Sequence, residues 1–213
     1  MNRREFLKVL GIMTAAGALW PEEVIAGLSS GENLASAEKL REAFEFYGGL
    51  KTFGLPISRP YEGEFGDYWL QAFQNGVLML NREGDCRLFP LIPEIQRQMG
   101  EGFLTENGIP SCREGYWWRP LCYRWLTNPA IKAAYFTDPR SEKNGPWLPE
   151  AFYGSPVSAP QNIRPHIVQS FEGCAWRVGE WCQEVNNGNL AQPLPLGDLA
   201  RKAGLIPDRK SVV

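Results

Sequence analysis

The sequence contains a single histidine, His166, among its 213 residues. Histidine-based metal sites and Ser-His-Asp catalysis both depend on an imidazole at a fixed place, so one copy leaves little room for either. His166 also aligns with Tyr68 in the internal duplication described below. That alignment favours a structural place for the imidazole.

Several catalytic signatures are absent from the sequence. It has no GxGxxG or GxxxxGK[ST] run, so nucleotide cofactors lack their usual phosphate cradle. It has no Gly-x-Ser-x-Gly nucleophile motif and no Cys-x-x-Cys pair. We therefore expect no metal ion and no cofactor, and these patterns identify no catalytic residue.

An excess of positive charge is also absent. Lys and Arg number 22 against 24 Asp and Glu, which gives a net charge of -2 and an isoelectric point near 5.6. Nucleic-acid binding requires a basic face that neutralises phosphates, so the balance argues against such a partner. The 44% apolar fraction is ordinary for a globular protein.

The N-terminus carries an export pattern. An apolar stretch from Val9 to Leu19 follows Arg3, Arg4, Phe6, Leu7 and Lys8. This arrangement resembles a twin-arginine signal peptide, whose pattern is Ser/Thr-Arg-Arg-x-Phe-Leu-Lys, with Asn2 here at the first position. The resemblance implies a prokaryotic protein exported in the folded state. It would act in the periplasm, at the cell surface or outside the cell.

The same segment indicates cleavage rather than anchoring. The apolar stretch has about half of the roughly 20 residues that span a bilayer, so we expect no permanent membrane span. Ala18 closes a small-x-small cleavage motif, and Ala26 closes a second one. We therefore expect the signal peptide within residues 1–26.

One stretch of the sequence occurs twice in similar form. Phe53–Pro60 recurs 100 positions later as Tyr153–Pro160, with the shared pattern Gly-x-Pro-x-Ser-x-Pro. Leu70–Phe73 recurs as Val168–Phe171, 98 positions later. A fainter match joins Leu91–Gly100 to Pro195–Gly204, and together these matches predict two tandem units.

The patterns in the first unit predict short elements. A helix capped by Ser36 has one apolar face and ends at Gly48-Gly49. An extended or turn segment follows, with Phe53 and Ile57 buried, and then a loop over 61–67. We expect three strands, over 69–73, 77–80 and 86–89, with a turn at Asn75-Gly76, and a helix from Pro93 to Gly100.

The second unit should repeat this order. Asn128 caps a helix that Pro129 opens and Phe136 ends, with Ile131, Ala134 and Tyr135 inward. About eleven extra residues, Thr137 to Trp147, then form a surface loop. We expect strands over 167–171, 175–178 and 181–185, and a helix over 198–203.

These elements give an α+β fold of two tandem repeat units with small antiparallel β-hairpins and short flanking helices. The expected divisions are a signal peptide over 1–26, a first unit over 36–102, a connector over 103–126, a second unit over 127–207 and a tail over 208–213.

The first unit also shows a family resemblance. Gly48–Pro56 and Gln71–Val77 resemble the LGFP-type repeats of bacterial cell-envelope proteins, although the turn here reads Phe-Gly-Leu-Pro. The resemblance implies a non-catalytic module that associates with the envelope. It assigns no ligand-binding residues.

Aromatic residues gather where the duplication is interrupted. These candidate binding rings are Tyr116, Trp117, Trp118, Trp125 and Trp147. Exposed rings can lie flat against sugars. The alternative is that they fill the seam between the two units, and the sequence leaves both interpretations open.

The sequence has five cysteines. Cys112 and Cys122 could close a small loop, because export permits disulfides, or they could be free buried thiols. A bridge between Cys174 and Cys182 is less favourable, because their expected strand positions do not face each other. At least one cysteine stays unpaired, and we expect it to be Cys86.

The expected function is an exported, envelope-associated binding or structural protein without catalysis, whose ligand is a polysaccharide or a peptidoglycan-like polymer. One alternative is an exported hydrolase of such polymers that uses the loop carboxylates Glu64, Asp67, Asp85, Asp138 and Glu142. A second alternative is a subunit of a larger exported complex.

Overall fold

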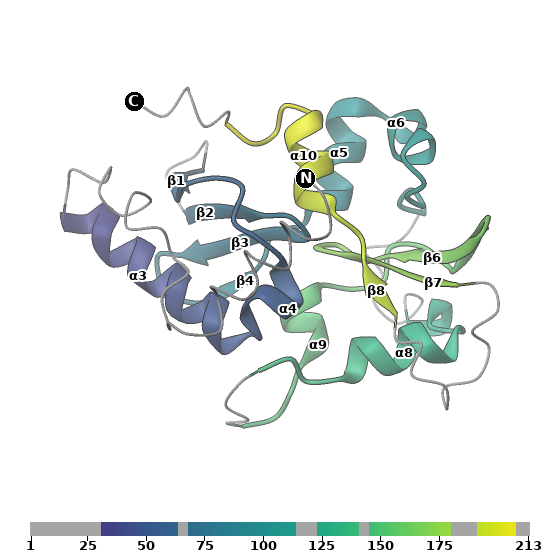
Figure 1. Ribbon diagram of the computed structural model, residues 1–213, viewed down its shortest axis with the longest axis horizontal. Helices are drawn as coiled ribbons and strands as arrows, with labels where there is room; N and C mark the ends of the chain where they lie inside the picture. Colours follow the sequence, from purple (N-terminus) through teal and green to yellow (C-terminus); the bar gives the residue numbers. More distant parts are fainter. Residues whose placement is uncertain (1–30, 64–67, 114–122, 141–144, 180–190, 208–213) are drawn as a thin grey trace, which may run out of the picture.

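The structure, a computed structural model, describes residues 31–63, 68–113, 123–140, 145–179 and 191–207. These parts of the chain form short helices and two four-stranded antiparallel sheets (Figure 1). The predicted α+β class, with hairpins and short flanking helices, is confirmed. The predicted signal peptide and the predicted C-terminal tail lie outside the described residues.

The first unit, from α3 to α6, contains one sheet. Its elements are α3 (Gly31–Phe46), α4 (Gly49–Phe53), β1 (Tyr61–Glu62), β2 (Tyr68–Phe73), β3 (Gly76–Asn81), β4 (Cys86–Leu88), α5 (Leu91–Met99) and α6 (Glu101–Glu106). The sheet order is β1-β2-β3-β4. Leu70 pairs with Met79 in the central hairpin, which has a two-residue turn at Gln74 and Asn75.

The second unit, from η1 to α10, contains the other sheet. Its elements are the 3-10 helix η1 (Tyr123–Trp125), α8 (Pro129–Phe136), α9 (Pro149–Tyr153), β5 (Gln161–Ile163), β6 (His166–Ser170), β7 (Ala175–Gly179), β8 (Gln192–Pro193) and α10 (Leu196–Lys202). The sheet order is β5-β6-β7-β8. The strands predicted over 181–185 lie outside the described residues.

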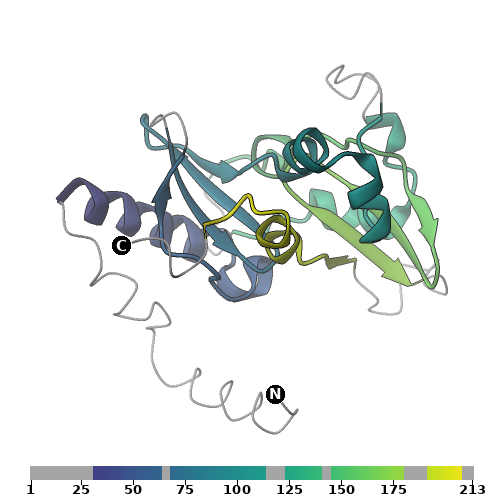
Figure 2. The ribbon, with the colours of Figure 1, turned by 90° about the horizontal axis from the view of Figure 1, so that it is seen from above.

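The helices form two layers on either side of the sheets. Figures 1 and 2 show α5, α6 and α10 together on one side, and Figure 1 shows α3, α4, α8 and α9 on the other. Because side chains alternate along a strand, each sheet contributes to both layers. On β2, for example, Phe73 belongs to a buried cluster rich in aromatic rings, which we call the aromatic cluster and which includes Tyr135 and Phe171. Leu70 belongs to a second buried cluster of mainly aliphatic side chains, such as Ile92 and Leu104.

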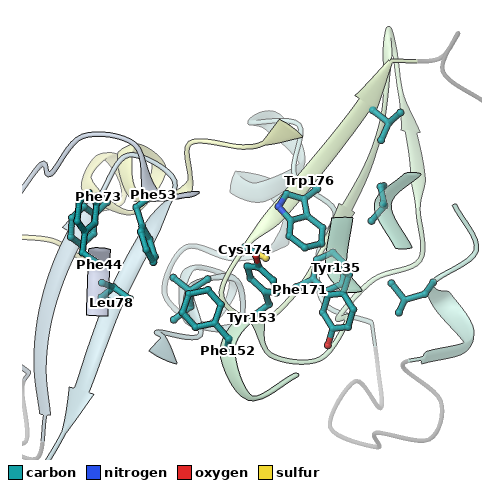
Figure 3. Packing of buried hydrophobic residues seen from close by; sticks show 14 of the residues in the cluster. Phe44, Phe53, Phe73, Leu78, Tyr135, Phe152, Tyr153, Phe171, Cys174 and Trp176 are labelled. Carbon is teal, nitrogen blue, oxygen red and sulfur yellow. The ribbon is translucent and has the colours of Figure 1, made fainter. Parts of the chain in front are cut away.

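The aromatic cluster joins the two units into one core. Phe44 stacks on Phe73 in the first unit with 4.9 Å between ring centroids, and Tyr135 stacks on Phe171 in the second with the same separation. Figure 3 shows the two groups of rings, with Phe152 and Tyr153 beside the second group. Phe152 also contacts the first unit, because it stacks on Tyr47 at 4.0 Å.

The duplicated bends have the same hydrogen bonds. In the first, the Ile57 amide donates to the Ala72 carbonyl at 2.9 Å; in the second, the Val157 amide donates to the Ser170 carbonyl at 3.0 Å. Pro56 and Pro156 each form an isolated bridge, to Phe73 and Phe171 respectively.

The serines of the two bends are also equivalent. Ser58 Oγ accepts from the Ala72 amide at 2.9 Å, and Ser158 Oγ accepts from the Ser170 amide at 3.0 Å. Both serines are buried. Each hydroxyl therefore satisfies a strand amide that has no water available to it.

The units contact each other reciprocally at their tight turns. The Ile92 amide, in α5, donates to the Glu172 carbonyl at 3.1 Å, and the Gly197 amide, in α10, donates to the Gln74 carbonyl at 3.0 Å. A Cβ on Gly197 would lie 1.7 Å from the Phe73 carbonyl oxygen. Only glycine fits where α10 meets the turn of the first unit.

Several predicted boundaries hold. Asn128 Oδ1 accepts from the amides of Ala130 and Ile131 at 3.1 and 3.0 Å, which confirms it as the cap of α8. Pro129 and Phe136 are the first and last residues of that helix. The predicted burial of Phe53 and Ile57 is also confirmed.

Other predictions about helices were wrong. Ser36 lies inside α3 instead of capping it, because the helix begins at Gly31. The segment before Gly54 forms the short helix α4, which starts after Gly48 reverses the chain with φ 95°. Helices α5 and α10 begin earlier than predicted, at Leu91 and Leu196. Pro93 fits within the first turn of α5, where its missing amide costs no hydrogen bond.

Three predictions about strands and register were also wrong. Each sheet has a further edge strand, β1 or β5, where the sequence shows glycine and proline rather than a strand pattern. The hairpin turn falls at Gln74-Asn75 instead of Asn75-Gly76, because both turn amides donate to the bend, to the carbonyls of Leu55 and Phe53. The Leu91 amide donates to the Phe89 carbonyl, and the Leu196 amide donates to the Leu194 carbonyl in the same way. The counterpart of Leu91 is therefore Leu196 rather than Pro195.

Candidate functional site

A cavity of about 1140 Å³ lies between the two units, and we call it the inter-unit groove. One wall is the edge of the first sheet, with Asp85, Cys86 and Arg87 on and beside β4. The other wall comes from the second unit, where α8, α9 and residues 146–148 between them contribute side chains. Part of this second wall is the end of the insertion predicted from the sequence over 137–147.

Aromatic side chains line much of the groove: Tyr47, Tyr123, Phe136, Trp147 and Phe152. Two of them present large exposed surfaces, with Tyr123 39% and Phe136 48% exposed. Tyr47 and Phe152 stack on each other and are more buried. The groove therefore has a firmly packed aromatic base and a rim with solvent-facing rings.

Trp147 is fixed between hydrophobic and charged neighbours. Its ring lies 5.8 Å from that of Phe152 and 5.7 Å from that of Tyr153. The guanidinium of Arg140 lies over the Trp147 ring, 5.4 Å from the centroid. The indole Nε1 is buried and has no hydrogen-bond partner in the described part of the chain.

Arg140 is itself held by an acidic neighbour. Its Nε donates to Asp138 Oδ1 at 2.8 Å and its backbone amide donates to the same oxygen at 2.9 Å. The hydrogen bonds that the guanidinium donates to the Asp138 carboxylate raise the pKa of Arg140. Arg140 also lies 6.0 Å from the ring of Phe46 in α3, so this ion pair attaches the second unit's insertion to the first unit.

Two carboxylates converge on Ser155 beside the groove. Ser155 Oγ donates to Glu150 Oε1 at 3.2 Å, and the Ser155 amide donates to Glu172 Oε2 at 3.0 Å. Tyr123 donates its phenol proton to Glu150 Oε2 at 2.6 Å. Glu150 and Glu172 both line the groove, so it combines ring faces with acidic hydrogen-bond acceptors.

A buried thiol and a buried phenol near the groove stay protonated at neutral pH. Burial raises the pKa of the Cys86 thiol to about 12. Burial also raises the pKa of Tyr135, with further contributions from Tyr123. Neither a thiolate nor a phenolate is therefore available at neutral pH from these two residues.

The five predicted binding rings have different positions. Trp147 lines the groove. Trp125 is partly exposed but belongs to η1, where Arg113 lies over its ring at 5.8 Å, and it does not line the groove. Tyr116, Trp117 and Trp118 lie outside the described residues. The structure therefore places one of the five in the groove.

The carboxylates predicted for a hydrolase are not assembled in the described part of the chain. The Asp85 carboxylate is bonded within its own turn, where its Oδ2 accepts from Asn81 Nδ2 at 3.3 Å. Asp138 forms the ion pair with Arg140. Glu64, Asp67 and Glu142 lie outside the described residues.

The cysteines and the histidine show no assembled site in the described part of the chain. Cys86, Cys112 and Cys174 are free thiols there, and Cys122 and Cys182 lie outside it, so the Cys112–Cys122 bridge stays a prediction. His166 begins β6 as Tyr68 begins β2. No group of three or more potential metal ligands occurs among the described residues.

Sequence reasoning missed Tyr123, Phe136, Glu150 and Glu172 as groove residues. The signal for the two glutamates was a difference between the copies of the duplication. Glu172 follows Phe171 where Gln74 follows Phe73 in the first copy. Glu150 corresponds to Leu50, because the two bends are 100 positions apart. A charged residue at one copy of an otherwise matched position indicates a local role.

Among the described residues, no helix has the length and apolar character needed to cross a membrane. Comparisons of the chain with family models, curated proteins and solved structures find no match.

Proposed function

We propose that the protein is an exported, envelope-associated binding protein without catalysis, whose inter-unit groove holds a polysaccharide or a peptidoglycan-like polymer. The observation that carries this proposal is the groove itself, with exposed rings at its rim and two carboxylates at its wall. The N-terminal twin-arginine pattern and the LGFP-type resemblance support export and association with the envelope.

The groove has the two kinds of surface that a sugar chain needs. A sugar ring presents a face of C–H groups that packs on aromatic rings, and Tyr123, Phe136 and Trp147 offer such rings. Sugar hydroxyls are donors, and the carboxylates of Glu150 and Glu172 are acceptors. Binding sites of this kind combine apolar walls with a few placed polar groups.

The chemistry of the groove favours binding over hydrolysis. The predicted loop carboxylates Asp85 and Asp138 are engaged in a turn and in an ion pair. Glycoside hydrolysis requires two carboxyl groups on opposite sides of the scissile bond. Glu150 and Glu172 already accept hydrogen bonds within the protein, Glu150 from Tyr123 and Ser155 and Glu172 from the Ser155 amide.

The test is a pull-down with isolated cell walls. We expect the protein to be retained without release of reducing sugar or peptide. Phe136→Ala should weaken retention about tenfold, because it removes an exposed ring from the rim. Met99→Ala is the matched control, since Met99 is 43% exposed in α5, away from the groove, and it should leave retention unchanged.

Two results would overturn the proposal. Release of reducing sugar from the walls would favour the exported hydrolase. Equal loss of retention in Phe136→Ala and Met99→Ala, or no retention of the wild type, would exclude the groove as the binding surface.

A further inference from the structure

We propose that the inter-unit groove selects an amino sugar with a free primary amine, whose ammonium group is held by Glu172. This inference rests on the proposed function, because it names the chemistry of the polysaccharide that the groove takes. It is carried by the comparison of Glu172 with its counterpart in the first unit, and by the charge and rings of the groove.

Glu172 and Gln74 have the same structural contact. Gln74 Oε1 accepts from the Leu55 amide at 3.0 Å, and Glu172 Oε2 accepts from the Ser155 amide at 3.0 Å. Each side chain also lies against the glycine of its bend. A Cβ on Gly54 would lie 2.7 Å from Gln74 Oε1, and one on Gly154 would lie 2.4 Å from Glu172 Oε2.

The fold therefore needs an oxygen acceptor at this position but not a negative charge. An amide meets the structural requirement in the first unit. The carboxylate in the second unit adds a charge next to the groove, whereas Gln74 does not line it. Within the described part of the chain, the Glu172 carboxylate accepts one hydrogen bond, from the Ser155 amide, and forms no ion pair.

The remaining charges leave the groove acidic. Three carboxylates line it, from Asp85, Glu150 and Glu172, together with the two cations Arg87 and Arg140. Arg140 is already neutralised by Asp138. The lining therefore favours a cationic ligand group.

The rings of the groove are also suited to a cation. The Arg140 guanidinium lies over Trp147 at 5.4 Å, so one ring at the groove already holds a positive charge on its face. Cation–π contacts are stronger where water is partly excluded. An amino sugar joins an ammonium group to a ring that can stack, which matches the carboxylates and the aromatic rim together.

The test compares two oligosaccharides of equal length by isothermal titration calorimetry on the full chain. One is a hexasaccharide of β-1,4-linked glucosamine, and the other is its N-acetylated form, which lacks the charge. We expect the amine form to bind at least about tenfold more tightly, the effect of a charge-assisted hydrogen bond. Glu172→Gln should reduce the ratio of the two affinities to near one.

Gln74→Glu is the matched control. It places a carboxylate at the equivalent position of the first unit, outside the groove, and should leave the affinity ratio of the wild type unchanged. Circular dichroism and thermal midpoints of both variants check that the fold is retained.

The outcomes separate this inference from the proposed function. Equal binding of the two hexasaccharides, or an unchanged ratio in Glu172→Gln, overturns the inference and leaves the groove as a polysaccharide site. Failure of the glucosamine hexasaccharide to bind also overturns the inference. The proposed function is overturned only if the wild-type protein is also not retained on cell walls. Tighter binding of hexalysine than of the glucosamine chain would overturn the sugar assignment.

Discussion

The bends of the two units have matching backbone hydrogen bonds but different side chains around them. Leu50, Leu55 and Gln74 surround the first bend, and Glu150, Ser155 and Glu172 occupy the corresponding places at the second. The backbone contacts agree closely, because the Ile57 amide donates to the Ala72 carbonyl at 2.9 Å and the Val157 amide donates to the Ser170 carbonyl at 3.0 Å. The difference teaches that the same backbone arrangement can carry apolar and amide side chains in one unit and carboxylates that line the groove in the other.

The largest expected effect comes from the contact between the units. Gly197→Ala would place a Cβ 1.7 Å from the Phe73 carbonyl oxygen, and neither backbone can move freely there. We expect a loss of about 3 kcal/mol or more in the free energy of unfolding, or failure to fold. Urea unfolding followed by tryptophan fluorescence measures it.

The control for this variant is Gly102→Ala, in α6. No atom lies within 4 Å of a Cβ at Gly102, so this substitution should be neutral or slightly stabilising. Equal stability of the two variants would mean that α10 does not pack on the first unit as described.

The next effect tests whether the two bends are energetically equivalent. Ser58→Ala and Ser158→Ala each leave a buried strand amide without its acceptor, at Ala72 and Ser170 respectively. Each should lower the free energy of unfolding by about 2 kcal/mol. Chemical denaturation of both single variants measures this, and a large effect in only one unit would break the equivalence.

Alkaline pH should destabilise both units through their buried thiols. Burial raises the pKa of Cys86 from 9.0 to about 12 in the first unit and raises that of Cys174 in the second. Between about pH 9 and 12 the unfolded chain releases a proton that the folded chain keeps. The free energy of unfolding should therefore fall with rising pH, by up to about 1.4 kcal/mol per pH unit for each thiol.

Denaturation between pH 8.5 and 10.5 checks this slope. Cys86→Ser should make the slope shallower, because a serine hydroxyl does not ionise in this range. A slope that stays the same in the variant would show that the Cys86 thiol ionises as readily in the folded chain as in the unfolded one.

The smallest effect separates the structural role of Glu172 from its charge. Glu172→Gln should change the free energy of unfolding by less than about 0.5 kcal/mol, because Gln74 makes the same contact in the first unit. Glu172→Ala should cost about 1 kcal/mol, since the Ser155 amide loses its acceptor. A large loss in Glu172→Gln would show that the charge itself supports the fold.

The sequence was most informative where local chemistry decides the structure. Asn128 and Pro129 start α8 as predicted, because a side-chain cap and a fixed φ act on their own neighbours. The turn at Gln74-Asn75 was misplaced by one residue, because its amides donate to the carbonyls of Leu55 and Phe53, about twenty positions away. A local pattern does not contain that constraint.

The groove was harder to predict than the fold. Trp147 was identified because it lies in an insertion, but Glu150 and Glu172 were missed, although each differs from its counterpart in the other copy. The two walls of the groove lie far apart in the sequence, since one contains Asp85 of the first unit and the other contains Glu150 of the second. Composition and spacing report which residues are present, but they do not report which of them meet.

The amide-to-carbonyl bonds from Ile92 to Glu172 and from Gly197 to Gln74 are reciprocal, since each unit donates one of them to the other. Each half provides the helix start that closes the other half's tight turn, so separating the halves would leave the Gln74 and Glu172 carbonyls without these donors. The two units are therefore coupled through backbone hydrogen bonds as well as through the shared aromatic core.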